Sequence, residues 1–151
     1  HVARMLDEAA RADARIRPVH RETNGHISRA TNSALAVARG AYVAFLDHDD
    51  LLSPDCLLHV AETAAQRPDA GMFYTDEDKI DDSGRHFDPQ LKGAWNPEMA
   101  LTHNYTHHLT VIRRELVEAV GGLRPDFDGA QDIDLILRCA ERLAASEVVH
   151  I

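Results

Sequence analysis

Basic residues are scarce in this sequence: 16 lysines and arginines stand against 25 aspartates and glutamates, and the formal net charge is −9. Nucleic-acid-binding proteins usually present a basic face that neutralises phosphates, so this deficit argues against a nucleic-acid partner. It does not argue against a ligand that carries phosphates, because a bound divalent cation can reverse the local sign of the charge.

Cysteines and long apolar runs are also rare. Cys56 and Cys139 lie far apart and form no Cys-x-x-Cys pair, so we expect buried reduced thiols and a reducing compartment. We expect no transmembrane segment and no signal peptide, because no apolar run approaches the length of a span. Hydrophobic residues still make up 44% of the 151 positions, which suits one domain with a real core.

Segments with strand-like and helix-like patterns alternate along the chain. Apolar runs or alternation predict strands over 14–19, 41–47, 70–80, 107–114 and 147–151. Apolar spacing and end signals predict helices over 2–13, 28–40, 53–66, 114–122 and 131–144, and a short helix that begins at Asn96-Pro97. Ser28 is the candidate cap of the second of these helices. Residues 81–90 are predicted to form a turn or hairpin with Ser83-Gly84 at its bend. This alternation predicts an α/β sandwich with a mostly parallel sheet, in which ligands bind beyond the carboxyl ends of the strands.

Two acidic clusters directly follow predicted strands. In "DHDD" (47–50), Asp47 and Asp49 point the same way along an extended chain, which suits Mg²⁺ or Mn²⁺. Alternatively, these acids cap the helix that begins near Pro54, or are simply solvated. In "TDEDKID" (75–81), the acids face the same cleft and a sugar hydroxyl, or form a charged turn balanced by a lysine and exposed to water.

Three further groups of polar residues are candidates for a site. Asp132 and Asp134, in "QDIDL", cannot share a face of their helix, so one of the two should look into a cleft, unless both are plain first-turn acids. His103 and His107 have i, i+4 spacing, but the strand-like "HHLTVI" argues against a zinc site there and favours a histidine that points into the cleft. The loop "NGHISRATN" (24–32) precedes a helix, a usual place to hold a phosphate.

These segments, taken in order, resemble the family 2 glycosyltransferases, and in particular bacterial enzymes that build O-antigen and other surface polysaccharides. The matching stretches are "NGHISRATNSALAVARGAYVAFLDHDDLLSPDCL", "FYTDEDKID", "LKGAWNPEM", "NYTHHLTVIRRELVEAVGGLRP" and "GAQDIDLILRCAE". The resemblance covers nearly the whole chain from about residue 15. Five motifs in this order are specific, whereas any one of them alone is not.

The resemblance implies a GT-A fold, a three-layer sandwich, and an inverting transfer of a sugar from a nucleotide-diphosphate-sugar donor. Asp132 resembles the catalytic base, and Asp49 and Asp47 resemble the acids of the metal-binding Asp-x-Asp motif for Mg²⁺ or Mn²⁺. The residues that match donor-binding positions are Asn24, Gly25, Arg29, Asn32, Asp47 and His48. The residues that match sugar- or acceptor-binding positions are Asp76, Glu77, Trp95, His108 and Gln131.

The same resemblance sets expectations for the whole molecule. We expect residues 1–151 to form a single catalytic domain that is incomplete at both ends, because the family's first strand–helix–strand unit, which grips the nucleotide base, precedes the matched region. His150 precedes the expected place of a later metal-binding histidine. The acceptor is expected to be a saccharide or a lipid-linked sugar, in the cytoplasm or at the inner face of a membrane.

Two other functions fit the same motifs. One is a non-catalytic module that binds nucleotides or carbohydrates. The other is a metal-dependent hydrolase of nucleotide sugars, with water in place of the acceptor. A product that contains free sugar and no extended acceptor would favour the hydrolase.

Overall fold

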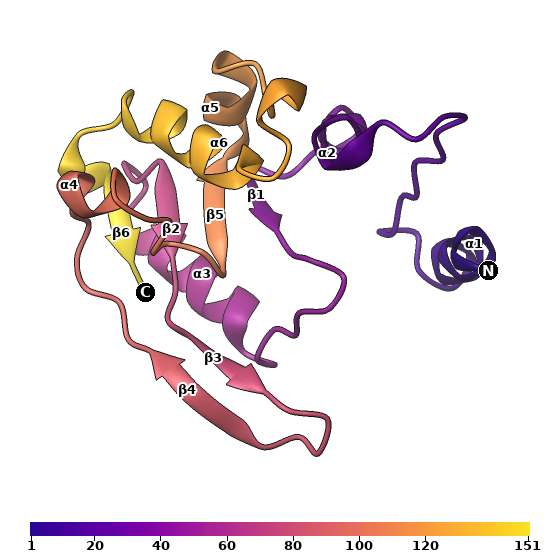
Figure 1. Ribbon diagram of the computed structural model, residues 1–151, viewed down its shortest axis with the longest axis horizontal. Coiled ribbons are helices and arrows are strands. Elements are labelled where there is room, and N and C mark those ends of the chain that lie inside the picture. Colours follow the sequence, from indigo (N-terminus) through magenta and orange to yellow (C-terminus); the bar gives the residue numbers. More distant parts are fainter.

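The computed structural model describes all 151 residues, and a mixed sheet of four strands forms its centre. The strands lie in the order β1 (Tyr42–Phe45), β5 (Thr110–Arg113), β2 (Met72–Tyr74) and β6 (Val148–His150). β5 is antiparallel to both of its neighbours, and β2 is parallel to β6. β1, β2 and β6 therefore share one direction, as Figure 1 shows. The predicted α/β class is confirmed.

The antiparallel strand β5 differs from the mostly parallel pairing that we predicted. Between β2 and β5 the chain forms the hairpin of β3 (Glu77–Ile80) and β4 (His86–Gln90), followed by the short helix α4 (Pro97–Ala100). No long helix carries the chain back across the sheet in this interval, as a parallel connection would require. β5 therefore starts at the edge where β2 ends.

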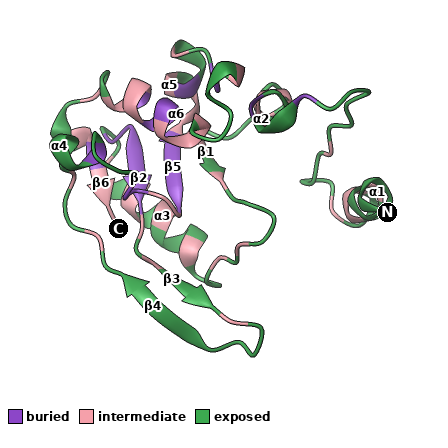
Figure 2. Cartoon of the chain, viewed as in Figure 1, coloured by how far each residue is buried: buried purple, intermediate pink, exposed green.

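Helices cover both faces of the sheet, which gives the expected three layers. Met72 and Tyr74 of β2 belong to a core cluster with residues of α5 (Arg114–Ala119) and α6 (Gln131–Ala140). Phe73, between them, belongs to the opposite cluster, which packs against α3 (Cys56–Gln66). This alternation follows from the two-residue period of a strand. Figure 2 shows the buried residues concentrated in β2, β5 and α6.

The two helices before the sheet differ in how they contact the rest of the chain. No residue of α1 (Val2–Ala12) is buried, and Figure 1 shows this helix apart from the sheet. α2 (His26–Leu35) is tied to a distant segment, because the Asn32 amide donates to the Leu123 carbonyl over 2.7 Å and accepts from the Leu123 amide over 2.9 Å. None of the helices combines the length and hydropathy that a membrane span requires.

Several predicted boundaries are wrong. Residues 14–19 form no strand, because they find no neighbouring strand and remain largely exposed. The predicted strand 70–80 divides into β2 and β3, since the chain leaves the central sheet after Tyr74 and pairs with β4. Ser28 does not cap α2: it lies inside the helix, is fully buried, and bonds to the Asp128 carboxylate. The hairpin bend predicted at 83–84 is confirmed.

Two 3-10 helices complete the chain, η1 (Pro125–Phe127) before α6 and η2 (Ala145–Glu147) before β6. Both cysteines are free thiols, as we predicted. Burial raises the pKa of the Cys139 thiol to about 11, so this side chain is an inert part of the core.

Candidate active site at the edge of the sheet

The polarity of β5 assembles the candidate site. The carboxyl ends of β1 and β2 lie at one edge of the sheet, and Asp47 and Asp76 follow them. Because β5 is antiparallel to both strands, its amino end lies at that same edge. His107 and His108, just before β5, therefore meet the acids that follow β1. The direction of β5 is therefore what places His108 at this edge.

Two neighbouring histidines link carboxylates from opposite sides of the site. His107 Nε2 lies 3.3 Å from Asp132 Oδ2 at the start of α6. His108 Nε2 lies 3.8 Å from Asp47 Oδ2 and 3.6 Å from Asp50 Oδ2. Burial lowers the pKa of His107 and the adjacent His108 lowers it further, against the opposing charges of the carboxylates. The proposed base and the first acid of the motif therefore share one polar network.

Asp132 and Asp134 diverge as their spacing predicts. Asp132 faces the site, where its Oδ2 accepts a hydrogen bond from Asn104 Nδ2 over 2.9 Å. Asp134 is buried on the other side of α6 and pairs with Arg124 and Arg138. Burial opposes the charge of Asp134, but the two guanidinium groups outweigh burial and hold the pKa of this carboxyl below its usual value. Only Asp132 is available to a substrate.

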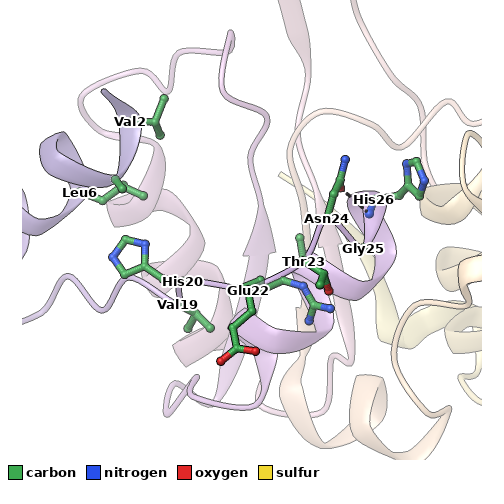
Figure 3. A pocket seen from close by; sticks show the side chains of 12 residues that line it. Val2, Leu6, Val19, His20, Glu22, Thr23, Asn24, Gly25 and His26 are labelled. Atoms are coloured by element: carbon green, nitrogen blue, oxygen red, sulfur yellow. Dashed lines mark hydrogen bonds between the residues drawn. The ribbon is translucent and has the colours of Figure 1, made fainter.

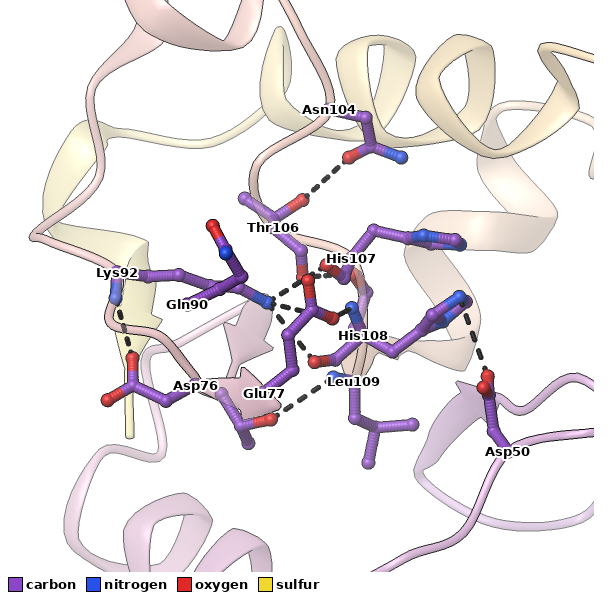
Figure 4. A network of polar contacts seen from close by, with 12 residues as sticks. Asp50, Asp76, Glu77, Gln90, Lys92, Asn104, Thr106, His107, His108 and Leu109 are labelled. Carbon is purple, nitrogen blue, oxygen red and sulfur yellow. Dashed lines mark hydrogen bonds and ion pairs between the residues drawn. The ribbon is translucent and has the colours of Figure 1, made fainter. Parts of the chain in front are cut away.

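A buried lysine and a glutamate hold the segment that carries the two histidines, as Figure 4 shows. The Lys92 side chain is 5% exposed, and its Nζ donates to the backbone carbonyls of His107 over 3.0 Å and His108 over 3.1 Å. Glu77 Oε2 lies 3.5 Å from Lys92 Nζ and accepts the backbone amide of His108. Charged groups therefore hold both the carbonyls and an amide of this backbone segment. We call Lys92 and Glu77 the clamp.

Asp76 is held next to the clamp. Its Oδ1 accepts the backbone amide of Lys92 over 2.7 Å and lies 2.7 Å from His150 Nε2. Burial opposes the charge of Asp76, but the Lys92 amide and His150 outweigh burial, so the pKa of this carboxyl lies below its usual value. His150 also stacks on Tyr74, with ring centroids 5.1 Å apart. Asp76 is an ionised group at the edge of the site.

The structure separates the two acids of the Asp-x-Asp pair. Asp47 lies near the histidines, and one ligand atom each of Asp47, His107 and His108 lies within 4.8 Å of the others. The side chain of Asp49 is 76% exposed, and its ion-pair partner, 3.6 Å away, is the even more exposed His48. Two buried atoms at this position lack a hydrogen-bond partner, Asp50 Oδ2 and His108 Nδ1. Asp47, His107 and His108 are the residues here that could hold a cation together.

Four of the residues predicted to bind the donor lie apart from this cluster: Asn24, Gly25, Arg29 and Asn32. Asn24 and Gly25 line a cavity of about 400 Å³ between α1 and the start of α2, shown in Figure 3, which contains none of the acids or histidines of the site. Arg29 is exposed on α2. The amide of Asn32 is occupied by the Leu123 backbone, which gives it a structural role.

The remaining predicted residues lie near the site with different surroundings. Trp95 is half-buried against the core and stacks on Tyr105, with ring centroids 6.0 Å apart. Gln131 opens α6, and its Oε1 accepts the Gly129 amide over 2.6 Å. Trp95 is thus mainly a packing residue, and Gln131 orders the turn that leads to Asp132.

Sequence reasoning did not place three residues that shape the site: Lys92, His107 and Asn104. His107 entered only as a disfavoured zinc ligand, paired with His103, which lies outside the cluster. A local signal could have identified His107 and Asn104, because the polar segment "NYTHH" directly precedes an apolar strand. Lys92 had no such signal, since an isolated lysine in a loop is usually solvated.

Comparisons with known proteins agree with this architecture. Residues 1–121 match the family described as Glycosyl transferase family 2. The chain is 49% identical over 150 residues to the uncharacterized protein y4gI of Sinorhizobium fredii, which covers 99% of the chain and 16% of that protein. It is 43% identical over 151 residues to the O-antigen biosynthesis protein RfbC of Myxococcus xanthus, which covers 100% of the chain and 12% of that protein.

A shorter relative shows a similar likeness. The uncharacterized glycosyltransferase EpsJ of Bacillus subtilis is 31% identical over 129 residues, which covers 76% of the chain and 36% of that protein. The chain therefore spans a small part of the length of each of these three relatives.

Proposed function

The chain belongs to glycosyl transferase family 2, which has the GT-A fold, and we propose that it is a catalytic domain that transfers a sugar during polysaccharide synthesis. In this proposal the donor is a nucleotide-diphosphate sugar and the acceptor is a saccharide or a lipid-linked sugar. The observation that carries the proposal is the pairing of Asp132 and Asp47, which come from opposite sides of the site, with two adjacent histidines.

Asp132 is the proposed base of an inverting transfer. Its carboxylate is partly exposed, with 32% of the side chain accessible, so an acceptor hydroxyl can reach it from solvent. Asn104 and His107 contact the same oxygen, Oδ2, which leaves Oδ1 free to accept a proton. A carboxylate in this position can take the proton of the attacking hydroxyl while the glycosidic bond to the diphosphate breaks. One such displacement inverts the anomeric carbon.

The leaving diphosphate is proposed to lie at the end of β1. Asp47 and Asp49 are the oxygen donors there for Mg²⁺ or Mn²⁺, and such an ion, when bound, neutralises the charge that gathers on a leaving diphosphate. His48 lies between these two acids in the sequence. Asn24, Gly25 and Arg29 are proposed to contact the donor farther out. Asn32 is left out of the proposed site because its amide is already paired.

The acceptor side is proposed to lie between the clamp and α6. Asp76 is ionised and can accept a hydrogen bond from a sugar hydroxyl. His108 lies between the donor-side acids and Glu77. Glu77, Trp95 and Gln131 border this region, although each also has the structural contact described above. A lipid-linked acceptor would place the reaction at the cytoplasmic face of a membrane.

The test is the conservative variant Asp132→Asn. We expect it to lower the transfer rate by about 10²–10⁴-fold, because an amide cannot accept the proton. Calorimetric titration with a nucleoside diphosphate should give unchanged binding. Asp126→Asn, an exposed acid in η1, is the matched control and should leave the rate unchanged.

Product analysis with a panel of nucleotide sugars completes the test. Extended acceptor supports transfer, whereas free sugar in the presence of acceptor would point to a hydrolase. Transfer by Asp132→Asn at the parental rate would contradict the assignment of the base.

A further inference from the structure

We infer that Phe87, on the hairpin of β3 and β4, is a stacking platform for the second sugar of the acceptor, so that the chain binds acceptors of two or more sugar units better than single sugars. The inference rests on the proposed function for the place of the acceptor, and it extends that site outward along the hairpin. Phe87 is 42% exposed, and Figure 2 shows the hairpin exposed along its length.

The register of the hairpin places Phe87 on the face that carries Glu77. Glu77 pairs with Gln90, and Lys79 pairs with Phe87. Residues two positions apart on a strand share a face of the sheet, and so do residues that pair across two strands. These four side chains therefore lie on one face. Glu77 reaches the backbone amide of His108 from this face, as Figure 4 shows, so the face looks toward the site.

A β-bulge in β4 is what turns the aromatic ring to this face. Between the two pairs, β3 advances by two residues, from 77 to 79, whereas β4 advances by three, from 87 to 90. The extra residue lies at Asp88-Pro89, where Asp88 has φ +52, and bulges are a usual place for a proline in a strand. Without the bulge, Phe87 would pair with Ile80 and point to the opposite face, away from the site.

Polar side chains beside the ring supply the hydrogen-bonding groups that a sugar needs. Asp88 accepts hydrogen bonds from Lys79 Nζ and, over 3.3 Å, from Gln90 Nε2. All three residues are exposed, and each has further donors or acceptors for hydroxyl groups. A sugar ring has an apolar face of C–H groups and a rim of hydroxyls, so a flat aromatic ring with polar neighbours matches both parts.

The position of the ring fits a second sugar unit. Lys79, the partner of Phe87, is two residues beyond Glu77, so the ring lies about 7 Å farther along the hairpin. This displacement is comparable to the advance of one sugar unit in a glycan. A first unit bound at Asp76 and Glu77 would therefore place its neighbour over the ring. One exposed ring among polar groups is also too small an apolar surface for a stable protein–protein interface, which favours a saccharide as the occupant.

The experiment titrates the 151-residue chain with methyl glycosides of glucose, galactose and N-acetylglucosamine and of their 1,4-linked disaccharides, and detects binding by saturation-transfer NMR. We expect at least one disaccharide to bind more tightly than its single sugar. Phe87→Ala should weaken that disaccharide on the order of tenfold, the scale of one stacking contact, and should leave the single sugar unchanged. Phe87→Trp should retain binding, whereas Phe87→Leu, which keeps apolar area without a flat ring, should not.

Ile80→Ala is the matched control. Ile80 is 43% exposed, close to the value for Phe87, but it lies on the opposite face of the hairpin, so its truncation should leave disaccharide binding unchanged. Equal disaccharide binding by the parent, Phe87→Ala and Ile80→Ala, or binding of no disaccharide in the panel, would overturn the inference. Self-association of the parent that Phe87→Ala abolishes, measured by sedimentation without any disaccharide bound, would also overturn it, because that result assigns the face to a second copy of the chain.

The two proposals fail separately. Disaccharide binding that depends on Phe87, in a chain that transfers no sugar, would refute the proposed function and leave the platform intact. Transfer to a disaccharide with the same KM in the parent and in Phe87→Ala would refute the platform and leave the proposed function intact. Both proposals together require Phe87→Ala to raise the KM for the disaccharide at unchanged kcat, since the ring binds the acceptor away from the reacting atoms.

Discussion

Replacing Lys92 with methionine tests whether the clamp holds the site together. Methionine fills the buried space of the lysine stem but removes the ammonium group. The carbonyls of His107 and His108 then lose their donors, and Glu77 loses its cation, while Glu77 keeps the amide of His108. Burial lowers the pKa of the Lys92 ammonium, and the charge of Glu77 opposes this lowering. Burial therefore disfavours the charged form of Lys92, and the contacts of the ammonium compensate for that cost.

The contacts give the size of the effect. A hydrogen bond to a charged group contributes about 1.5–3 kcal/mol, so the two carbonyl bonds of Lys92 contribute about 3–6 kcal/mol together. The pair with Glu77 adds little, because Glu77 is 32% exposed and a screened pair contributes up to about 1 kcal/mol. Water can reach the half-buried carbonyls in the variant. We therefore expect a loss near the lower end, about 3 kcal/mol.

Urea unfolding at neutral pH measures this loss directly. The matched control is Lys79→Met, which removes a lysine of the neighbouring hairpin whose partner Asp88 and whose own side chain are both largely exposed. The control should lose no more than about 1 kcal/mol of unfolding free energy. If Lys92→Met lost no more than Lys79→Met, the reasoning that the clamp fixes the histidine segment would be wrong.

Two further predictions concern stability. Asp134 is held ionised by its two arginine partners, so its folded pKa is below the ordinary 3.8 and its stabilisation is complete above that value and lost as the pH falls through the lower folded pKa. Urea midpoints of the parent should therefore fall more steeply below about pH 4 than those of Asp134→Asn, and equal slopes would contradict this. Gly122 has φ +69 and an added Cβ would lie 2.6 Å from Asn32 Oδ1, whereas Gly84 has φ +82 and open space around it. Gly122→Ala should thus lose more unfolding free energy than Gly84→Ala, which carries only the backbone cost of about 1–2 kcal/mol.

The sequence was most informative where the chain's pattern is local. The run 41–47 predicted β1, and the Asn96–Pro97 signal predicted the start of α4, where the Asn96 side chain accepts the Met99 amide over 3.0 Å. The divergence of Asp132 and Asp134 followed from helical geometry alone. These features depend on residues a few positions apart.

Features that depend on distant partners were not readable. The pattern 107–114 predicted a strand but carried no information about its direction, and that direction decides which edge receives His107 and His108. The alternation that suggested Asp47 and Asp49 as a pair holds for an extended chain, but the chain turns after β1 and Asp49 swings outward. Lys92 is buried only because two backbone carbonyls far along the chain accept its hydrogen bonds.

The antiparallel strand also sets when the site can exist during folding. Asp132 contacts Asn104 from 28 positions away, and Glu77 contacts His108 from 31 positions away, so each contact closes a long loop. Closing such a loop has an entropic cost, and only the pairing of β5 with both β1 and β2 offsets it. The polar cluster should therefore form late, only in molecules that have completed the whole sheet.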